Sequence, residues 1–109
     1  MRFIKKGYEY RQVYGNHKRI RGSYFKLLWQ ENNKIDDVAF GLIVSSKVGN
    51  AVMRNKIKRR MRAYLREINS KLKDKGKGVI IAQISAAGAD WRQTCADLSV
   101  ILKTSGVYA

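Results

Sequence analysis

The sequence predicts an α+β fold, a two-layer sandwich in which helices pack on a sheet. Two apolar runs, residues 38–45 (VAFGLIVS) and 79–84 (VIIAQI), are typical of buried strands. A third segment, residues 23–30, alternates as a strand with one covered face does. Segments with helical spacing surround these strands. The predicted order is therefore α-β-β-(β)-α-β-α, with a split β-α-β connection.

The first predicted elements are a short helix and a basic loop. Residues 6–14 have a spacing that places Tyr10, Val13 and Tyr14 on one side of a helix. Residues 16–22 (NHKRIRG) are expected to form a loop rich in cations. Its single histidine, His17, is expected to be one more surface donor rather than a catalyst.

The strand over residues 23–30 is expected to have two different faces. One face carries Phe25, Leu27 and Trp29, and the other carries Tyr24, Lys26 and Leu28. Residues 31–37 (ENNKIDD) are rich in Asn and Asp, which is typical of a turn-like loop before the next strand.

A long basic helix is predicted to follow, with Asn50 as its N-cap after Gly49. Its apolar residues share one face: Ile57, Met61, Tyr64, Leu65, Ile68 and Leu72. Polar residues share the other: Asn55, Lys58, Arg59, Arg62 and Arg66, with Arg54 near the boundary. The glycines in residues 71–78 are expected to end this helix. After the next strand, Asp90 is expected to cap a last helix with a side formed by Trp91, Cys95, Leu98 and Leu102.

Length and composition predict one packed globular domain, residues 1–109, with a strongly cationic surface. Hydrophobic residues make up 45% of the chain, and 23 basic against 8 acidic residues give a net charge of +15. Nucleic acid, an anionic membrane and an acidic protein are the partner classes that such a charge allows. A membrane is the weakest of these, because no apolar run approaches the roughly 18 residues of a spanning helix.

The N-terminal residues lack the apolar middle of a secretory signal, and Cys95 has no second cysteine with which to form an internal disulfide. Both features favour a cytoplasmic protein. Cys95 itself lies at core spacing and is expected to be a small buried side chain. One His and one Cys allow no ordinary metal cluster, and no paired carboxylates or nucleophile–base arrangement is evident. We therefore expect neither catalytic residues nor a metal held by the protein alone.

The most informative segment, residues 47–66, contains eight Lys or Arg residues and no acid. A solvated helix face usually mixes charges of both signs, so this one indicates a phosphate-rich partner. Arg side chains also match pairs of phosphate oxygens. For each tyrosine of the N-terminal part taken alone, packing in the core is the favoured interpretation; these residues are Tyr8, Tyr10, Tyr14 and Tyr24. Together with Arg11 and Lys26, they would also suit a surface on which single-stranded bases stack.

Residues 47–62, KVGNAVMRNKIKRRMR, match every fixed position of K-x-G-x-A-V-x-R-N-x-x-K-R-x-x-R. In this motif the chain resembles the protein subunit of bacterial ribonuclease P, and the resemblance extends over about residues 5–104. It departs from the family pattern at four places: Ser46 replaces a lysine, Gln83–Ile84 replaces an Arg–Pro pair, His17 lies where a glycine is often found, and the N-terminal basic arm is short.

The resemblance implies a protein that binds a catalytic RNA, one RNA with one protein, and helps to remove the 5′ leader of precursor tRNA. The RNA would supply the active site and hold most of the magnesium ions. It also implies a left-handed crossover in the fold. The residues expected to bind the catalytic RNA are Lys47, Arg54, Asn55, Lys56, Lys58, Arg59, Arg62 and Arg66. Those expected to line the leader cleft are Tyr10, Tyr14, Lys26 and Leu28.

Two other functions are compatible with the composition. A ribosomal or other structural RNA-binding protein would use the same charge without serving an enzyme. A metal-dependent nuclease acting alone would need clustered carboxylates, whereas the eight acids of this chain are scattered.

Overall fold

The structure is a computed structural model that describes residues 1–32, 34–72 and 75–107. Five strands form one mixed sheet in the order β1-β4-β5-β3-β2. The strands are β1 (Arg2–Phe3), β2 (Lys18–Arg21), β3 (Phe25–Glu31), β4 (Val38–Ile43) and β5 (Gly76–Ala82). The helices are α1 (Gly7–Gly15), α2 (Ala51–Glu67) and α3 (Trp91–Ser105), with short 3-10 turns at Asn69–Lys71 and Ile84–Gly88.

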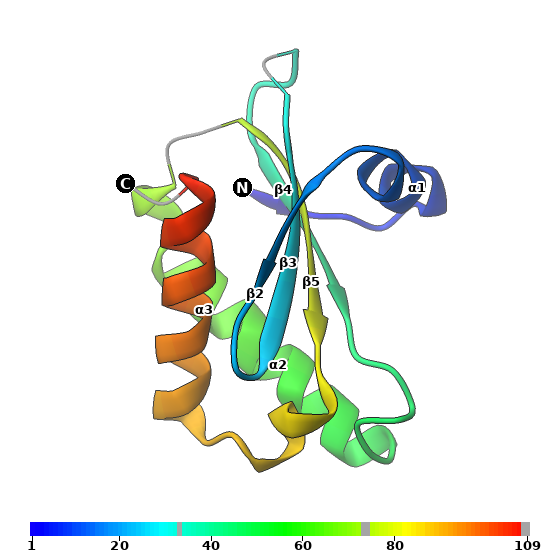
Figure 1. The fold of residues 1–109 in the computed structure, drawn as a ribbon, viewed down its shortest axis with the longest axis vertical. Coiled ribbons are helices and arrows are strands. Elements are labelled where there is room, and N and C mark those ends of the chain that lie inside the picture. Colours follow the sequence, from blue (N-terminus) through cyan, green and yellow to red (C-terminus); the bar gives the residue numbers. More distant parts are fainter. Residues whose placement is uncertain (33, 73–74, 108–109) are drawn as a thin grey trace.

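The predicted α+β class is confirmed, and the helices cover the two faces of the sheet unequally (Figure 1). Helices α2 and α3 pack on one face and form the main core together with it. The largest fully buried side chains of this core include Phe25, Phe40, Met61, Leu65 and Ile80. Helix α1 packs on the opposite face near one end, where Val13 meets Leu28 and Val79. The sandwich therefore has a third, partial layer, and much of one sheet face is not covered by a helix.

The connection through α2 joins β4 to β5, which are parallel and directly paired, as Gly41 with Val79. A split β-α-β unit was predicted from the sequence, with another strand between the two that the helix connects. That detail is wrong, because β4 and β5 are neighbours in the sheet. The left-handed crossover stays a prediction. β3 then pairs antiparallel with β5, and β2 antiparallel with β3.

Two strands were not predicted. The stretch predicted as a loop over residues 16–22 contains β2, an edge strand of sequence KRIR. Its one apolar residue, Ile20, gives no alternating hydrophobic pattern, and charged residues are common on edge strands because they discourage pairing with other chains. The other, β1, has only two residues and pairs parallel with β4.

The end of the basic helix also differs from the prediction. α2 ends at Glu67, so Leu72 lies beyond the helix, although it still packs against the core. Gly76 and Gly78 begin β5 instead of ending the helix. A side chain at Gly76 would collide with the carbonyl oxygen of Gln30, and a Cβ at Gly78 would lie 2.8 Å from the Phe40 ring. Close packing of neighbouring strands therefore accounts for both glycines.

Both predicted helix caps are confirmed. The Asn50 side chain accepts a hydrogen bond from the Met53 N–H at 3.0 Å, and Asp90 accepts one from the Gln93 N–H at 2.7 Å. Gln93 returns the bond by accepting from the Asp90 N–H, which completes a capping box. On the last helix, Leu98 and Leu102 are buried and Cys95 is half-buried against the core. Trp91 is 41% exposed, contrary to the prediction, because the buried residues of α3 begin one turn later.

Helix α3 is fixed to the sheet by one buried carboxylate. Asp97 accepts hydrogen bonds from three consecutive backbone N–H groups in the turn after β2, those of Ser23 (2.7 Å), Tyr24 (3.0 Å) and Phe25 (2.8 Å). The Asp97 side chain is nearly buried, the Phe25 hydrogen bond is buried and the other two are partly buried, so the Phe25 amide above all has no easy access to water if the carboxylate is removed.

We predict that Asp97→Ala lowers the free energy of unfolding by roughly 2 to 3 kcal/mol, because it leaves buried donors without an acceptor. Urea denaturation measures this. Asp36→Ala, which removes an exposed loop aspartate, is the matched control and should change stability by less than about 0.5 kcal/mol. Equal effects of the two substitutions would contradict the role given to Asp97.

Candidate nucleic-acid interface

Helix α2 is built to present its cations outward. Its Asn50 cap satisfies one of the first N–H groups, and the apolar face is buried at Ile57, Met61, Tyr64 and Leu65. Because a helix turns by about 100° per residue, burial of this face forces the intervening residues toward solvent. The predicted apolar and polar faces are therefore both confirmed within residues 51–67.

The outward face, here named the α2 surface, contains the residues predicted to bind the catalytic RNA. Arg54 and Lys58 are half-buried at its edge, and the exposed members are Asn55, Lys56, Arg59, Arg62 and Arg66, with Lys47 exposed in the preceding loop. Among the residues that the structure describes, no carboxylate lies within ion-pair distance of these cations. Their mutual repulsion would be relieved by a polyanion.

Three arginines of α2 also contact the protein itself. The Nη1 of Arg54 donates to the carbonyl oxygen of Gly49 at 2.9 Å, and that of Arg60 donates to the carbonyl oxygen of Ala89 at 3.0 Å. Arg66 stacks its guanidinium 5.5 Å from the centre of the Phe3 ring. Arg60 therefore has a structural contact on the α3 side of the helix, whereas the residues predicted as RNA contacts gather on the other sides.

The tyrosines predicted for the leader cleft lie together on α1. The rings of Tyr10 and Tyr14 are 6.4 Å apart and tilted by 41°. Tyr10 packs over Gly41, where a Cβ would collide with its ring, so this glycine gives α1 room to approach the sheet. Tyr14 remains 46% exposed, and partial burial raises the pKa of its hydroxyl. It is therefore neutral and able to stack at physiological pH.

The other two predicted cleft residues differ in access. Lys26 is half-buried on the sheet face that α1 covers. Leu28 lies on the same face but is 5% exposed, because Val13 of α1 packs against it. Its assignment to the cleft stays a prediction, yet little of its surface remains for a ligand. His17 is half-buried, and its Nδ1 lies 2.9 Å from the Val13 carbonyl oxygen at the end of α1, so this nitrogen contacts the protein itself.

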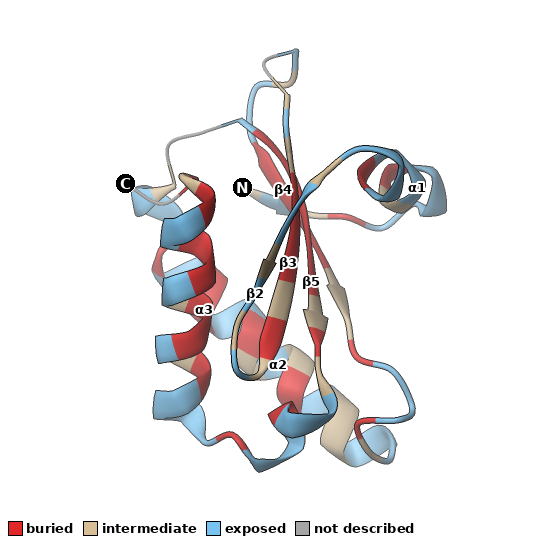
Figure 2. Cartoon of the chain, in the orientation of Figure 1, coloured by how far each residue is buried: buried red, intermediate tan, exposed pale blue. Residues whose placement is uncertain are grey.

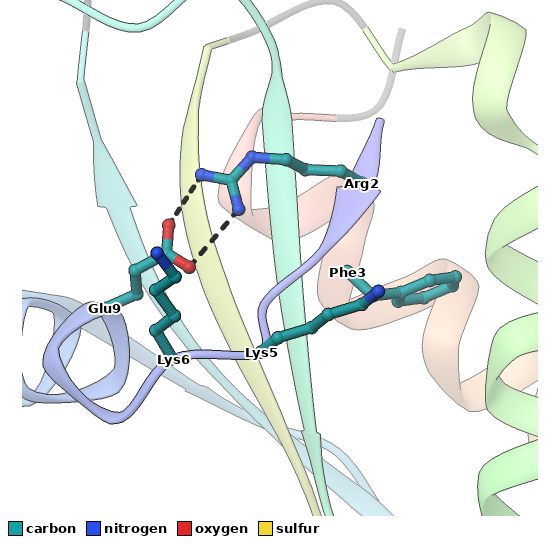
Figure 3. A pocket seen from close by; sticks show the side chains of 5 residues that line it. All are labelled: Arg2, Phe3, Lys5, Lys6 and Glu9. Atoms are coloured by element: carbon teal, nitrogen blue, oxygen red, sulfur yellow. Dashed lines mark hydrogen bonds and ion pairs between the residues drawn. The ribbon is translucent and has the colours of Figure 1, made fainter.

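An ionic network centred on the buried Glu9 holds α1 against the sheet, and Figure 3 shows its contact with Arg2. Glu9, 4% exposed, accepts two hydrogen bonds from Arg2 of β1, at 2.6 and 3.3 Å, and lies 3.3 Å from the Nζ of Lys77 in β5. Lys77 donates in turn to the side chain of Gln12 at 2.7 Å. The Arg2 hydrogen bonds, aided by Lys77, lower the pKa of Glu9 despite its burial. No sequence pattern marked Glu9, because a single acid among cations resembles a solvated charge.

The α2 surface and Tyr10 of α1 meet at one small pocket. It has a volume of about 140 Å³ and is lined by Lys58 and Arg62 of α2, Tyr10 of α1, and Phe3, Ile4, Phe40 and Leu42. Lys58 and Arg62, expected to contact the catalytic RNA, thus line the same pocket as Tyr10, which is expected to contact the leader.

Two cations on the sheet face where α1 packs were not identified from the sequence. In β2, Arg19 pairs with Leu28 and Arg21 with Lys26, so both arginines share the sheet face on which α1 lies. The basic residues were visible in the sequence as NHKRIRG, but the prediction of a loop does not say to which side their side chains point.

Among the described residues, no group of three His, Cys, Asp or Glu side chains is placed to hold a metal ion. None of the described helices is both long and apolar enough to cross a membrane.

Fold and surface together define a small basic α+β protein whose α2 surface, without an ion-pair partner among the described residues, suits a polyanionic partner. Comparison with known proteins names the family: the family model described as Ribonuclease P matches residues 1–106. The chain belongs to the ribonuclease P protein family. It is 34% identical to the ribonuclease P protein component of Syntrophomonas wolfei over 97% of this chain and 88% of that protein. Identity to the Bacillus pumilus component is 32%, over 96% and 88%.

Solved structures agree with this membership. The ribonuclease P protein of Staphylococcus aureus matches with a TM-score of 0.91 and 30% identity, over 98% of this chain and 97% of that one. The Thermotoga maritima protein, at 23% identity and a TM-score of 0.83, supports the fold, covering 93% and 94% of the two chains. Membership of this family implies a part in a tRNA-processing ribonucleoprotein nuclease and an RNA partner.

We predict that Glu9→Gln lowers the free energy of unfolding by roughly 1 to 3 kcal/mol near neutral pH, because it removes the acceptor shared by two cations. The native pKa of Glu9 is depressed, so its stabilisation is present above the ordinary value of 4.5 and is lost as the pH falls through the lower native value. The difference between wild type and variant should therefore shrink in acid. Urea denaturation from pH 7 to pH 3 measures it, and a pH-independent difference would contradict an ionic role.

Proposed function

We propose that this protein binds the catalytic RNA of ribonuclease P through the α2 surface and receives the 5′ leader of precursor tRNA on the α1 side of the sheet. Binding of the catalytic RNA is supported by the α2 surface itself. This surface belongs to a capped helix whose outward cations have no carboxylate partner among the described residues. Arg forks on a rigid support suit the paired oxygens of RNA phosphates.

The leader assignment has its support in the α1 face. Tyr10 and Tyr14 offer two rings at the edge of a sheet surface that also carries Lys26, a combination suited to single-stranded bases and their phosphates. The protein's part in the reaction is then to hold the leader and orient the substrate. The catalytic RNA would supply the reacting groups and hold most of the magnesium ions, which activate water and stabilise the leaving oxygen. We expect one protein to act with one RNA, in the cytoplasm.

A single experiment tests this function against its alternatives. Precursor tRNA and magnesium are incubated with the protein alone, with the catalytic RNA alone and with both. The proposal requires that the protein alone is inactive and that it stimulates cleavage by the RNA at low salt and low magnesium. Cleavage by the protein alone would identify an independent nuclease, and RNA binding without stimulation would identify a structural RNA-binding protein.

The α2 surface is tested by Arg59→Ala, which removes an exposed cation opposite the buried face. We expect the dissociation constant for the catalytic RNA to increase by a factor corresponding to roughly 1 to 3 kcal/mol, with a smaller salt dependence, because fewer counterions are released. Arg62→Ala should act similarly. Arg92→Ala on α3 makes the same charge change away from this surface and is the control. Unchanged RNA affinity in a variant whose circular dichroism is also unchanged would exclude the contact.

The leader contact is tested by Tyr14→Ala. Precursor tRNA should bind the holoenzyme about 1 kcal/mol more weakly, and mature tRNA unchanged, if one base stacks on this ring. Tyr8→Ala is the matched control, since Tyr8 is similarly exposed at 49% but lies two residues from Tyr10 on another side of α1. An equal loss for precursor and mature tRNA would refute the assignment while leaving the rest of the proposal intact.

A further inference from the structure

Beyond the end of α1, one row of side chains runs across the exposed part of the sheet. The strand registers align Arg21 of β2 with Lys26 of β3, Lys26 with Ile81 of β5, and Ile81 with Ile43 of β4. The neighbouring row contains Leu28 and Val79, on which Val13 of α1 packs, so both rows share one sheet face. Figure 2 colours parts of β4 and β5 near their ends away from α1 as intermediate in burial, and Ile43 and Ile81 are half-buried.

Arg21 is held in a defined position by Gln83, the residue that follows β5. The Gln83 Nε2 donates to the carbonyl oxygens of Gly22 (2.9 Å) and Phe25 (3.3 Å), which fixes the amide beside the β2–β3 turn. The Gln83 Oε1 then accepts from the Nε of Arg21 at 2.9 Å. This contact uses one edge of the guanidinium and leaves the two terminal nitrogens for another acceptor.

The charge of this row is not compensated by the protein. Lys26 lies directly across from Arg21, and like charges in paired positions destabilise a sheet. Within the described residues, no carboxylate is at ion-pair distance from either cation. The nearest buried acid of this region, Asp97, is occupied by the three amides of the β2–β3 turn. An anion between Arg21 and Lys26 would remove the repulsion.

We propose that Arg21, positioned by Gln83, forms with Lys26 a binding site for one backbone phosphate of the 5′ leader. This inference rests on the proposed function and extends it to a named pair of residues. Ile43 and Ile81, half-buried in the same row, give the adjoining sugar or base an apolar surface. The leader would then cross the sheet from the tyrosines of α1 to the β2–β3 turn. Arg21 contacts substrate, and Gln83 is a positioning residue.

The first test compares Arg21→Gln with Lys18→Gln in the holoenzyme. Both remove one exposed cation from β2, but Lys18 pairs with Trp29 and so belongs to the opposite face. Arg21→Gln should weaken binding of precursor tRNA by roughly three- to fivefold, as expected for one exposed charged contact, and leave mature tRNA unchanged. The slope of log affinity against log salt should decrease by about 0.7 for the lost single-strand phosphate contact. Lys18→Gln should change neither quantity.

A second measurement identifies the phosphate. Precursor tRNAs are prepared with one neutral methylphosphonate linkage at each leader position in turn. At one position the wild type should lose the same three- to fivefold, and Arg21→Gln should lose nothing further, as in a double-mutant cycle. If Arg21→Gln remains as sensitive as the wild type at every linkage, no leader phosphate is bound there and the inference is overturned.

Gln83→Ala tests the positioning role. It should reproduce the loss of precursor preference seen in Arg21→Gln, and the double variant should lose no more than either single one. Ser85→Ala is the matched control, because the Ser85 hydroxyl donates to the Ser23 carbonyl oxygen at 2.7 Å and supports the same turn without touching Arg21. If both variants lower the melting temperature equally and neither changes the preference, Gln83 is only structural and its positioning role is refuted.

The outcomes separate this inference from the proposed function. A wild-type holoenzyme that binds precursor and mature tRNA equally would refute the leader proposal and this inference with it. A wild type that prefers precursor tRNA, with Arg21→Gln unchanged, would refute the inference alone. Weaker binding of the catalytic RNA by Arg21→Gln, with the precursor preference retained, would assign the phosphate to that RNA and would also overturn it.

Discussion

Strand β5 lies between β4 and β3, and packing on both of its faces sets the position of every surface described above. Ile80 points into the core shared with α2 and α3, while Val79 points to the opposite face, where Val13 of α1 covers it. The strand begins with two glycines because its neighbours leave no room for side chains there. A strand buried on both sides therefore fixes α2 and α1 relative to each other.

Charge is organised by the same core. Eight of the 23 Lys and Arg residues stand in residues 47–66, and Arg19, Arg21 and Lys26 lie on the sheet face that α1 partly covers. Two acids have positions that organise the fold instead of neutralising this surface. Glu9 joins α1 to β1 and β5, and Asp97 joins α3 to the β2–β3 turn. Within the described residues, the cations of the α2 surface have no carboxylate at ion-pair distance, and a phosphate backbone would neutralise them.

The two acids illustrate why the site was only partly predictable. Asn50, the apolar face of α2 and its outward cations followed from spacing, since cap chemistry and helical periodicity are local rules. Glu9 and Asp97 have no such local signature, because their partners are 7 to 74 residues away in the chain. Gln83, a departure from the family pattern, likewise gained a meaning only when the fold placed it beside Arg21.

The sequence by itself determined the α+β class, the central motif and hence the family, because these depend on composition, periodicity and a run of adjacent residues. Only the tertiary structure decided that residues 18–21 form an edge strand, that Leu28 lies beneath α1, and that Arg21 and Lys26 share one row. Strand pairing is a contact between distant segments, and its register determines which face each side chain occupies. A cationic segment without apolar alternation does not indicate its own register. The face on which each of its side chains lies is therefore known only from its pairing with β3.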